Sequence, residues 1–291
     1  MVNLSFEIPL LGTPARVEMS LLPWCKVAAI SIKPETMAAS RLPSYFMGNL
    51  KASIEAVDGM PLAYAARQAL ETDSRAQAAF FAQRFDIYQQ IRAAGRMFAR
   101  CPHCESGEVE MSLLALFNTL GVMPPEMFST DLMFLRSPAS GPSQPTPERP
   151  AQFAYASRIR CELPTRLLGL PRTGFEAGVF GRFRYERYRE LMARWETDGV
   201  NVPAAQGWRT NRHDAFCTTM WLIAALHETT PPDDVTLEAF EQLPGVDVYF
   251  VDAIFHLAFE VDVPAHAQER ACPSCAKAFV PVAAFKPTDI A

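Results

Sequence analysis

Glycine and lysine are both scarce in this chain of 291 residues. It has 14 glycines against 24 prolines, so rigid turns are expected in place of the glycine-rich loops that cradle phosphates. The 27 basic residues are 5 lysines and 22 arginines, and 32 acidic residues leave a net charge of −5. An acidic balance argues against a protein that binds nucleic acid over its whole surface. Wholesale disorder is excluded as well, because 49% of the residues are hydrophobic.

Long hydrophobic runs are also missing. The longest apolar stretch, residues 216–226, is shorter than the roughly 18 residues that a membrane span needs. The first 19 residues do not combine a basic region with the apolar core of a signal peptide. We therefore expect a protein without a membrane span that is cytoplasmic when synthesised.

Catalytic signatures are absent from the sequence. The histidines at positions 213, 227, 256 and 266 form neither an HExxH nor a His-x-Glu pattern. The glycines between residues 169 and 181 match neither a GxGxxG fingerprint nor a Walker loop. No Ser/His/Asp order can be singled out. We therefore expect that the protein is not an enzyme.

Two short cysteine motifs carry the clearest chemical signal. Four of the seven cysteines form CPHC and CPSC, which share the pattern Cys-Pro-x-Cys. Proline after the first cysteine fixes φ in a tight turn, so that two thiolates can converge on one ion. A structural zinc ion needs four ligands, and two similar knuckles supply them. The sequence predicts one closed, structural zinc site formed by Cys101, Cys104, Cys272 and Cys275.

Other interpretations of the cysteine pairs stay open. Each pair could hold a separate or an intermolecular metal ion, or both could be chance. CPHC also resembles the redox motif of thioredoxin-like periplasmic oxidases, but there a long helix follows directly, whereas here Glu105, Ser106 and Gly107 break the chain. Many zinc knuckles have glycine after the second cysteine, where this sequence has Glu105 and Ala276. We expect His103 to point away from the metal.

Hydrophobic periodicity separates short extended segments from longer helices. Alternation from Phe6 to Met19 predicts a hairpin at the start. Apolar residues at three- and four-residue steps predict helices, most clearly over 62–94. The expected helices cover residues 44–57, 62–94, 112–120, 182–198, 211–228, 235–242 and 246–260, and the expected extended segments cover 96–100, 108–111 and 278–282. The fold class that follows is mainly α with small β elements (α+β).

A proline-rich segment, residues 137–150, marks the clearest boundary. It holds five prolines and one apolar side chain, which is typical of an exposed linker. Residues 1–136 would form a hairpin and helical domain with the first knuckle, and residues 151–265 a second, helical domain. Residues 266–291 would form the second knuckle and a tail that packs on the first domain. The zinc ribbon is then closed by N-terminal and C-terminal knuckles around a helical insertion.

An arginine-rich segment, residues 158–194, is the second candidate for function. It contains nine arginines and no lysine, with phenylalanines and tyrosines between them. Three interpretations fit this composition: a solvated helix face, a contact surface for another protein, or a surface for nucleic acid. The proposed contact residues are Arg182, Arg184, Tyr185, Arg187 and Tyr188.

The C-terminal part of the chain resembles a known group of proteins. Residues 243–247 (LPGVD) and 251–255 (VDAIF), followed by Ala271–Cys275 and Phe279, resemble the small assembly and hub proteins of contractile phage tails and related injection systems. The opening hairpin is compatible with the extended N-terminal segment of those proteins. This resemblance implies a non-enzymatic role in building a tail baseplate, other proteins of a large assembly as partners, and a place in the virion. The alternative is a zinc-ribbon regulator that binds nucleic acid through residues 158–194.

Overall fold

The computed structural model of the chain shows a mixed α+β fold built around three antiparallel sheets. The expectation of a mainly α protein is therefore wrong, because strands and helices contribute comparably. The expected helix at 112–120 and the linker at 137–150 lie outside the described residues. The structure describes residues 4–25, 53–61, 64–111, 154–170, 174–181, 184–199, 219, 222–232, 235–259 and 268–282.

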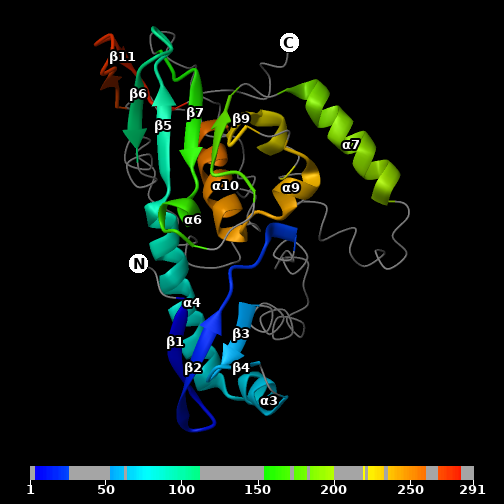
Figure 1. Ribbon diagram of the computed structural model, residues 1–291. Coiled ribbons are helices and arrows are strands. Elements are labelled where there is room, and N and C mark those ends of the chain that lie inside the picture. Colours follow the sequence, from blue (N-terminus) through cyan, green and yellow to red (C-terminus); the bar gives the residue numbers. More distant parts are fainter. Residues whose placement is uncertain are drawn as a thin grey trace, which may run out of the picture.

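A four-stranded sheet, in the order β1-β2-β3-β4, begins the fold (Figure 1). The predicted hairpin is confirmed as β1 (Ser5–Leu10) and β2 (Thr13–Met19). The helix expected to run to residue 57 is wrong at its end, which is strand β3 (Ile54–Val57) followed by β4 (Met60–Pro61). Asp58 and Gly59 have φ of 52° and 73°, so this Asp-Gly pair makes a hairpin turn and does not stop a helix.

Two helices pack against this sheet where one long helix was expected. Helix α3 (Tyr64–Thr72) and helix α4 (Ser74–Ala94) are separated by Asp73. The Asp73 carboxylate accepts hydrogen bonds from the backbone N–H groups of Arg75 (2.9 Å) and Ala76 (3.2 Å), which makes it the N-cap of α4. The break is therefore set by a capping residue inside an otherwise continuous helical pattern. The shared core includes Ile8, Val17, Leu70, Phe80, Ile87 and Ile91.

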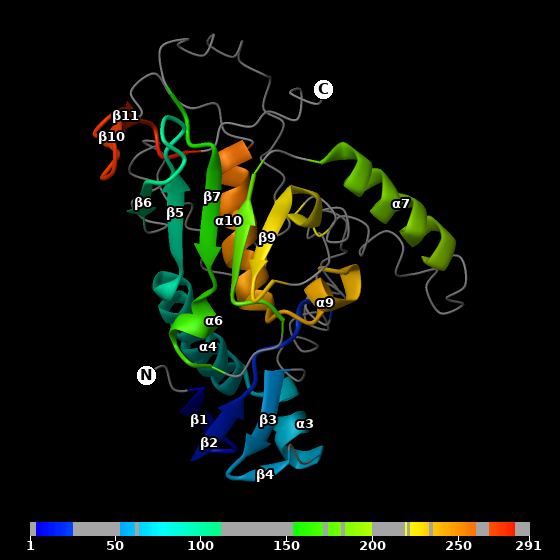
Figure 2. The ribbon, with the colours of Figure 1, turned by 45° about the horizontal axis from the view of Figure 1, so that its top comes forward.

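A five-stranded sheet in the order β6-β5-β7-β8-β9 forms the other half of the fold (Figure 2). The predicted extended segments are confirmed as β5 (Arg96–Arg100) and β6 (Glu108–Met111). Three further strands were missed: β7 (Arg158–Glu162), β8 (Ala177–Phe180) and β9 (Leu226–Thr230). The helix expected to reach residue 228 therefore ends before β9. Since β5 pairs with β7, this sheet joins residues on both sides of the segment 137–150.

One face of the five-stranded sheet packs on an apolar helix. Helix α10 (Gly245–Phe259) confirms the helix expected at 246–260 and lies behind the sheet in both views (Figures 1 and 2). Helices α7 (Tyr185–Gly199) and α9 (Leu237–Glu241) also match expected helices. A Cβ at Gly95 would lie 2.4 Å from the Phe250 ring, so α4 can meet β5 at this point only without a side chain. The core joins Met97, Ile159, Cys161, Phe180, Val248, Phe250 and Ile254.

A buried carboxylate fixes the start of α10. Asp247 is 1% exposed, and its carboxylate accepts hydrogen bonds from the backbone N–H (3.0 Å) and the hydroxyl (2.5 Å) of Thr165. Thr165 lies in the short helix α6 (Pro164–Leu167), whose first backbone N–H groups have no partner within the helix. The acidic residue of the LPGVD segment thus ties two helices together. Among the described residues, no helix is long and apolar enough to cross a bilayer.

Replacing Asp247 by alanine should destabilise the protein by about 3 kcal/mol, because it leaves a buried N–H and a buried hydroxyl without their acceptor. Urea denaturation followed by tryptophan fluorescence measures this loss. Asp86→Ala provides the control, since Asp86 is exposed on α4. A midpoint for Asp247→Ala equal to that of the control would contradict the role assigned to Asp247.

Candidate metal centre

The structure brings the four cysteines of the two motifs into one cluster. The Sγ atoms of Cys101 and Cys275 are 3.8 Å apart, those of Cys104 and Cys272 are 3.7 Å apart, and all four lie within 4.8 Å of one another. Four thiolates at about 2.3 Å from a tetrahedral ion would be separated by about 3.8 Å. The cluster therefore has the size of a tetrahedral metal–thiolate site, and one chain supplies all four ligands.

Two hairpins position the sulfur atoms. Cys101 and Cys104 lie in the turn between β5 and β6, and Cys272 and Cys275 lie in the turn between β10 (Arg270–Ala271) and β11 (Ala278–Phe279). Each turn follows one pattern of hydrogen bonds. The residue two positions after the first cysteine donates its N–H to that cysteine's Sγ at 3.4 Å, and the residue after the second cysteine donates to the first cysteine's carbonyl. At Cys272, burial opposes the charged form, yet the backbone N–H groups of Cys275 and Ser274 lower the pKa of the thiol.

The close approach of the hairpins depends on glycine at one position. A Cβ on Gly107 would lie 2.3 Å from Cys272 Sγ and 2.9 Å from the Ser274 hydroxyl oxygen. Glycine is therefore required at position 107, where the β10–β11 hairpin lies against the β5–β6 hairpin. Many zinc knuckles have their glycine directly after the second cysteine, which is position 105 in this chain.

The residues that follow the second cysteine of each motif adopt a left-handed conformation. Glu105 has φ of 54° and Ala276 has φ of 60°. This conformation costs an L-residue about 1–2 kcal/mol and costs glycine almost nothing. Glu105 and Ala276 therefore occupy positions where many zinc knuckles have glycine, and both turns still adopt the left-handed conformation there.

A small apolar core lies beneath the sulfur atoms. Cys101 and Cys272 are buried with Ala99, Ala156 and Phe279, whereas Cys104 and Cys275 are half-buried. The segment before β7 joins the two hairpins, because Ser157 donates its N–H to the Arg100 carbonyl and Val280 donates to the Ala154 carbonyl. The second hairpin is thus held at the end of the sheet far from β1–β4 (Figure 2).

Four adjacent thiols do not ionise equally. The Ser106 hydroxyl, with the backbone N–H groups of Gly107 and Ser106, lowers the pKa of Cys104 to about 6. The Lys277 backbone opposes the shift at Cys275, yet burial and the neighbouring sulfurs raise the pKa of Cys275 to about 11. Four thiolates at this spacing repel one another, so a bound cation is needed for all four to be ionised together.

The geometry of the CPHC motif differs from that of a thioredoxin-like redox site. The CPHC motif lies in a hairpin turn and leads into strand β6, whereas the thioredoxin-like arrangement requires a helix after the first cysteine. The His103 side chain is exposed, and its Nε2 lies 3.2 Å from the Ala278 carbonyl oxygen of the second hairpin. The contributions of Ser106, Gly107 and residues 154–157 were not predicted, because the spacing of a motif does not reveal which residues pack on its turn.

The arginine-rich segment contains elements that the sequence did not predict. Residues 158–162 form β7, whose outer side chains are Arg158, Arg160 and Glu162. Arg160 Nη2 is 2.7 Å from Glu108 Oε2 and Arg160 Nη1 is 2.6 Å from Glu162 Oε1. Arg158 Nη1 is 2.7 Å from Glu228 Oε1. These arginines therefore form a network of ion pairs with glutamates on the outer face of the sheet.

The proposed contact residues are positioned in different ways. Arg184 donates to the Ala224 carbonyl at 3.2 Å, to that of Ile223 at 3.4 Å, and also to that of Leu226. A substitution there would disturb the fold, so it cannot test a contact surface on its own. Tyr188 packs against the main core, while Tyr185 is 45% exposed. Arg182 lies outside the described residues, and the contact surface stays a prediction.

Glycine introduced at position 105 or 276 should stabilise the folded protein by about 1 kcal/mol for each site, because it removes the cost of left-handed backbone. Thermal melting of Glu105→Gly and Ala276→Gly, each compared with the unsubstituted chain, measures the gain. Gly107→Ala is the opposite control, since its Cβ would collide with Cys272 Sγ, and it should lower the melting temperature. Destabilisation by the two glycine variants would show that the knuckles do not adopt this turn.

The chain matches no protein-family model, no curated protein and no solved structure. What the chain shows is four cysteines from two hairpins, converging with the spacing that a four-coordinate metal ion requires.

Proposed function

We propose that the four cysteines hold one structural zinc ion per chain. Zinc favours tetrahedral thiolate sites, and a site with four protein ligands leaves no open position for a substrate. Cys101, Cys104, Cys272 and Cys275 would be the ligands, and the ion would supply the positive charge that four adjacent thiolates require. The ion would fasten the β10–β11 hairpin to the β5–β6 hairpin.

The variant Cys272→Ser should lose the zinc, because three thiolates and a hydroxyl make a far weaker site. The loosened part should be limited to residues 268–279, since Val280 and Val282 are buried in the main core and need no metal to stay there. Elemental analysis and hydrogen exchange measure the two effects.

Cys25→Ala is the matched control, because Cys25 lies outside the cluster and should leave one zinc per chain. Wild-type protein that contains no zinc after purification without chelators would refute the assignment.

We propose further that the protein is a non-enzymatic assembly component of a contractile tail baseplate or a related particle. The observation that carries the proposal is the closed cysteine cluster, which holds two distant parts of the chain together and leaves no ligand position for catalysis. The resemblance of residues 243–279 to tail hub proteins is the reason for proposing a contractile tail as the particle. Other proteins of the particle would be its partners, and residues 182–188 would contribute to the contact.

The charge distribution favours a protein partner over nucleic acid. A surface that neutralises phosphates needs arginines that are available to the phosphate oxygens. Here Arg158, Arg160 and Arg166 are already within 2.9 Å of glutamate oxygens. Binding of nucleic acid through residues 158–194 is therefore the competing outcome of the test.

The substitution Tyr185→Ala should lower the particle-bound fraction of the chain at least about fivefold, since exposed tyrosines in a contact surface commonly contribute most to binding. Gradient sedimentation of lysates from cells that encode the protein measures this fraction. Met60→Ala is the matched control, because Met60 is 66% exposed on the distant β3–β4 hairpin.

Both variants should keep their zinc content and melting temperature. Wild-type chain that sediments alone would contradict the assembly role. Tight binding of DNA or RNA that weakens steeply with salt would support the nucleic-acid regulator instead.

A further inference from the structure

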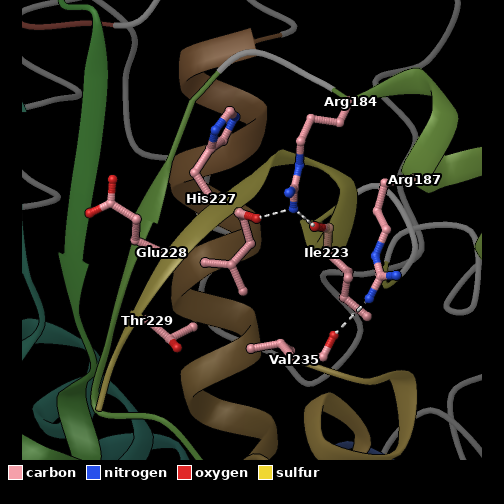
Figure 3. A pocket seen from close by; sticks show the side chains of 8 residues that line it. Arg184, Arg187, Ile223, His227, Glu228, Thr229 and Val235 are labelled. Atoms are coloured by element: carbon pink, nitrogen blue, oxygen red, sulfur yellow. Dashed lines mark hydrogen bonds between the residues drawn. The ribbon is translucent and has the colours of Figure 1, made fainter. Parts of the chain in front are cut away.

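A hollow of about 190 Å³ lies between the first turn of α7 and strand β9. Its accessible lining is mostly polar, with two arginines, a histidine and a threonine beside a smaller apolar part (Figure 3). Cavities of about 150 Å³ in proteins bind a molecule the size of benzene, so this hollow has room for a small ligand or for one side chain of another protein. The lining residues are Arg184, Arg187, Ile223, Leu226, His227, Glu228, Thr229 and Val235.

Two arginines extend from the N-terminal end of α7 across the hollow (Figure 3). Arg184 donates to carbonyls at its upper edge, and Arg187 Nη2 donates to the Val235 carbonyl oxygen at 3.3 Å at its lower edge. The N-terminal end of a helix also carries partial positive charge. The hollow is therefore a basic site in a chain whose net charge is −5.

The hydrogen bonds made by Arg187 are weak. The contact with Val235 at 3.3 Å and the contact of Nη1 with Glu190 Oε2 at 3.4 Å are both longer than a good N–H···O bond. The Glu190 side chain is 66% exposed, so that ion pair adds little. A carboxylate in the hollow would offer Arg187 a shorter, charge-assisted bond with the two-pronged geometry that guanidinium favours.

The acidic residue of the lining does not compete for this position. Figure 3 shows the Glu228 carboxylate turned away from the two arginines. Its Oε1 lies 2.7 Å from Arg158 Nη1 on the neighbouring part of the sheet. The other glutamates on the first turns of α7 lie outside the lining, and Glu186 is 83% exposed and 3.9 Å from Arg189.

The size of the hollow favours a ligand larger than a bare anion. Its accessible lining is mostly polar, and the buried side chains of Ile223, Leu226 and Val235 contribute only a small apolar part. A carboxylate on a stem of a few carbon atoms would occupy the volume while its charged end contacts Arg187.

We propose that this hollow is a binding site for a carboxylate on a short aliphatic stem, which is either a small carboxylic acid or a glutamate side chain of a partner protein. Both ligands present the same group, a carboxylate on a short stem. The evidence for the site is the geometry of the hollow. The proposal therefore does not depend on the assembly role.

Titration of the full, zinc-loaded chain tests the proposal, with isotope-edited NMR as the readout. Butyrate represents the free acid, and N-acetyl-glutamate methylamide represents the side chain in a protein. Butyramide, which has the same shape without charge, serves as the comparison ligand. Butyrate should saturate, with shifts confined to residues around the hollow, and butyramide should bind at least about tenfold more weakly.

Arg187→Gln should weaken butyrate binding at least about tenfold, and Arg187→Lys should restore part of it. The matched control is Arg189→Gln, which removes the same charge from the same helix, where Arg189 is 65% exposed. Binding of both acids points to a partner side chain, and binding of butyrate alone points to a small molecule. The proposal is overturned if butyrate does not saturate, if butyramide binds equally well, or if Arg187→Gln and Arg189→Gln have the same affinity.

Discussion

The burial of helix α10 is the constraint on which the rest of the structure depends. Apolar side chains cover most of its first ten residues, and a helix of this kind is stable only when other elements enclose it. Val248, Phe250 and Ile254 belong to the core of the five-stranded sheet, while Val246 belongs to the core of the N-terminal sheet. The helix therefore holds the two halves of the fold together. Gly95 and Asp247 serve this same packing, one by leaving room for a ring and the other by satisfying the start of α6.

The cysteine cluster and the opening hairpin are the features that the sequence predicted best. Both depend on local rules: alternation around a turn for Phe6–Met19, and ligand spacing for the two Cys-Pro-x-Cys motifs. The long helices were also recognisable, but the break at Asp73 was not, because a capping residue looks ordinary within a helical pattern. Strands β7 and β8 were missed for a different reason. Charged residues alternate with buried ones in β7, and their partners lie far away in the sequence, so only the paired sheet reveals the role of Arg158 and Arg160.

The outer face of the five-stranded sheet shows how charge can be abundant without being available. Arg160 contacts Glu108 and Glu162, and its guanidinium lies 3.9 Å from the centre of the Phe98 ring. This network of ion pairs gives the sheet a polar surface whose net charge is close to zero. Composition alone suggested a basic patch over residues 158–194, whereas register places acidic partners from β6, β7 and β9 beside these arginines. The number of charged residues in a segment therefore does not predict the electrostatic potential at its surface in the folded protein.

The separation of the two knuckles along the chain has a consequence for the order of folding. Cys104 and Cys272 are 168 residues apart, whereas each knuckle closes over a few residues. Local hairpins form within microseconds, but contacts between distant segments must wait until the loop between them closes. During synthesis the first knuckle leaves the ribosome long before the second, and its two thiols stay exposed to metal ions and oxidants in the interval. Completion of the tetrad is therefore a late step, and a metal ion bound by all four cysteines would require that the segments around Cys101 and Cys275 have already come together.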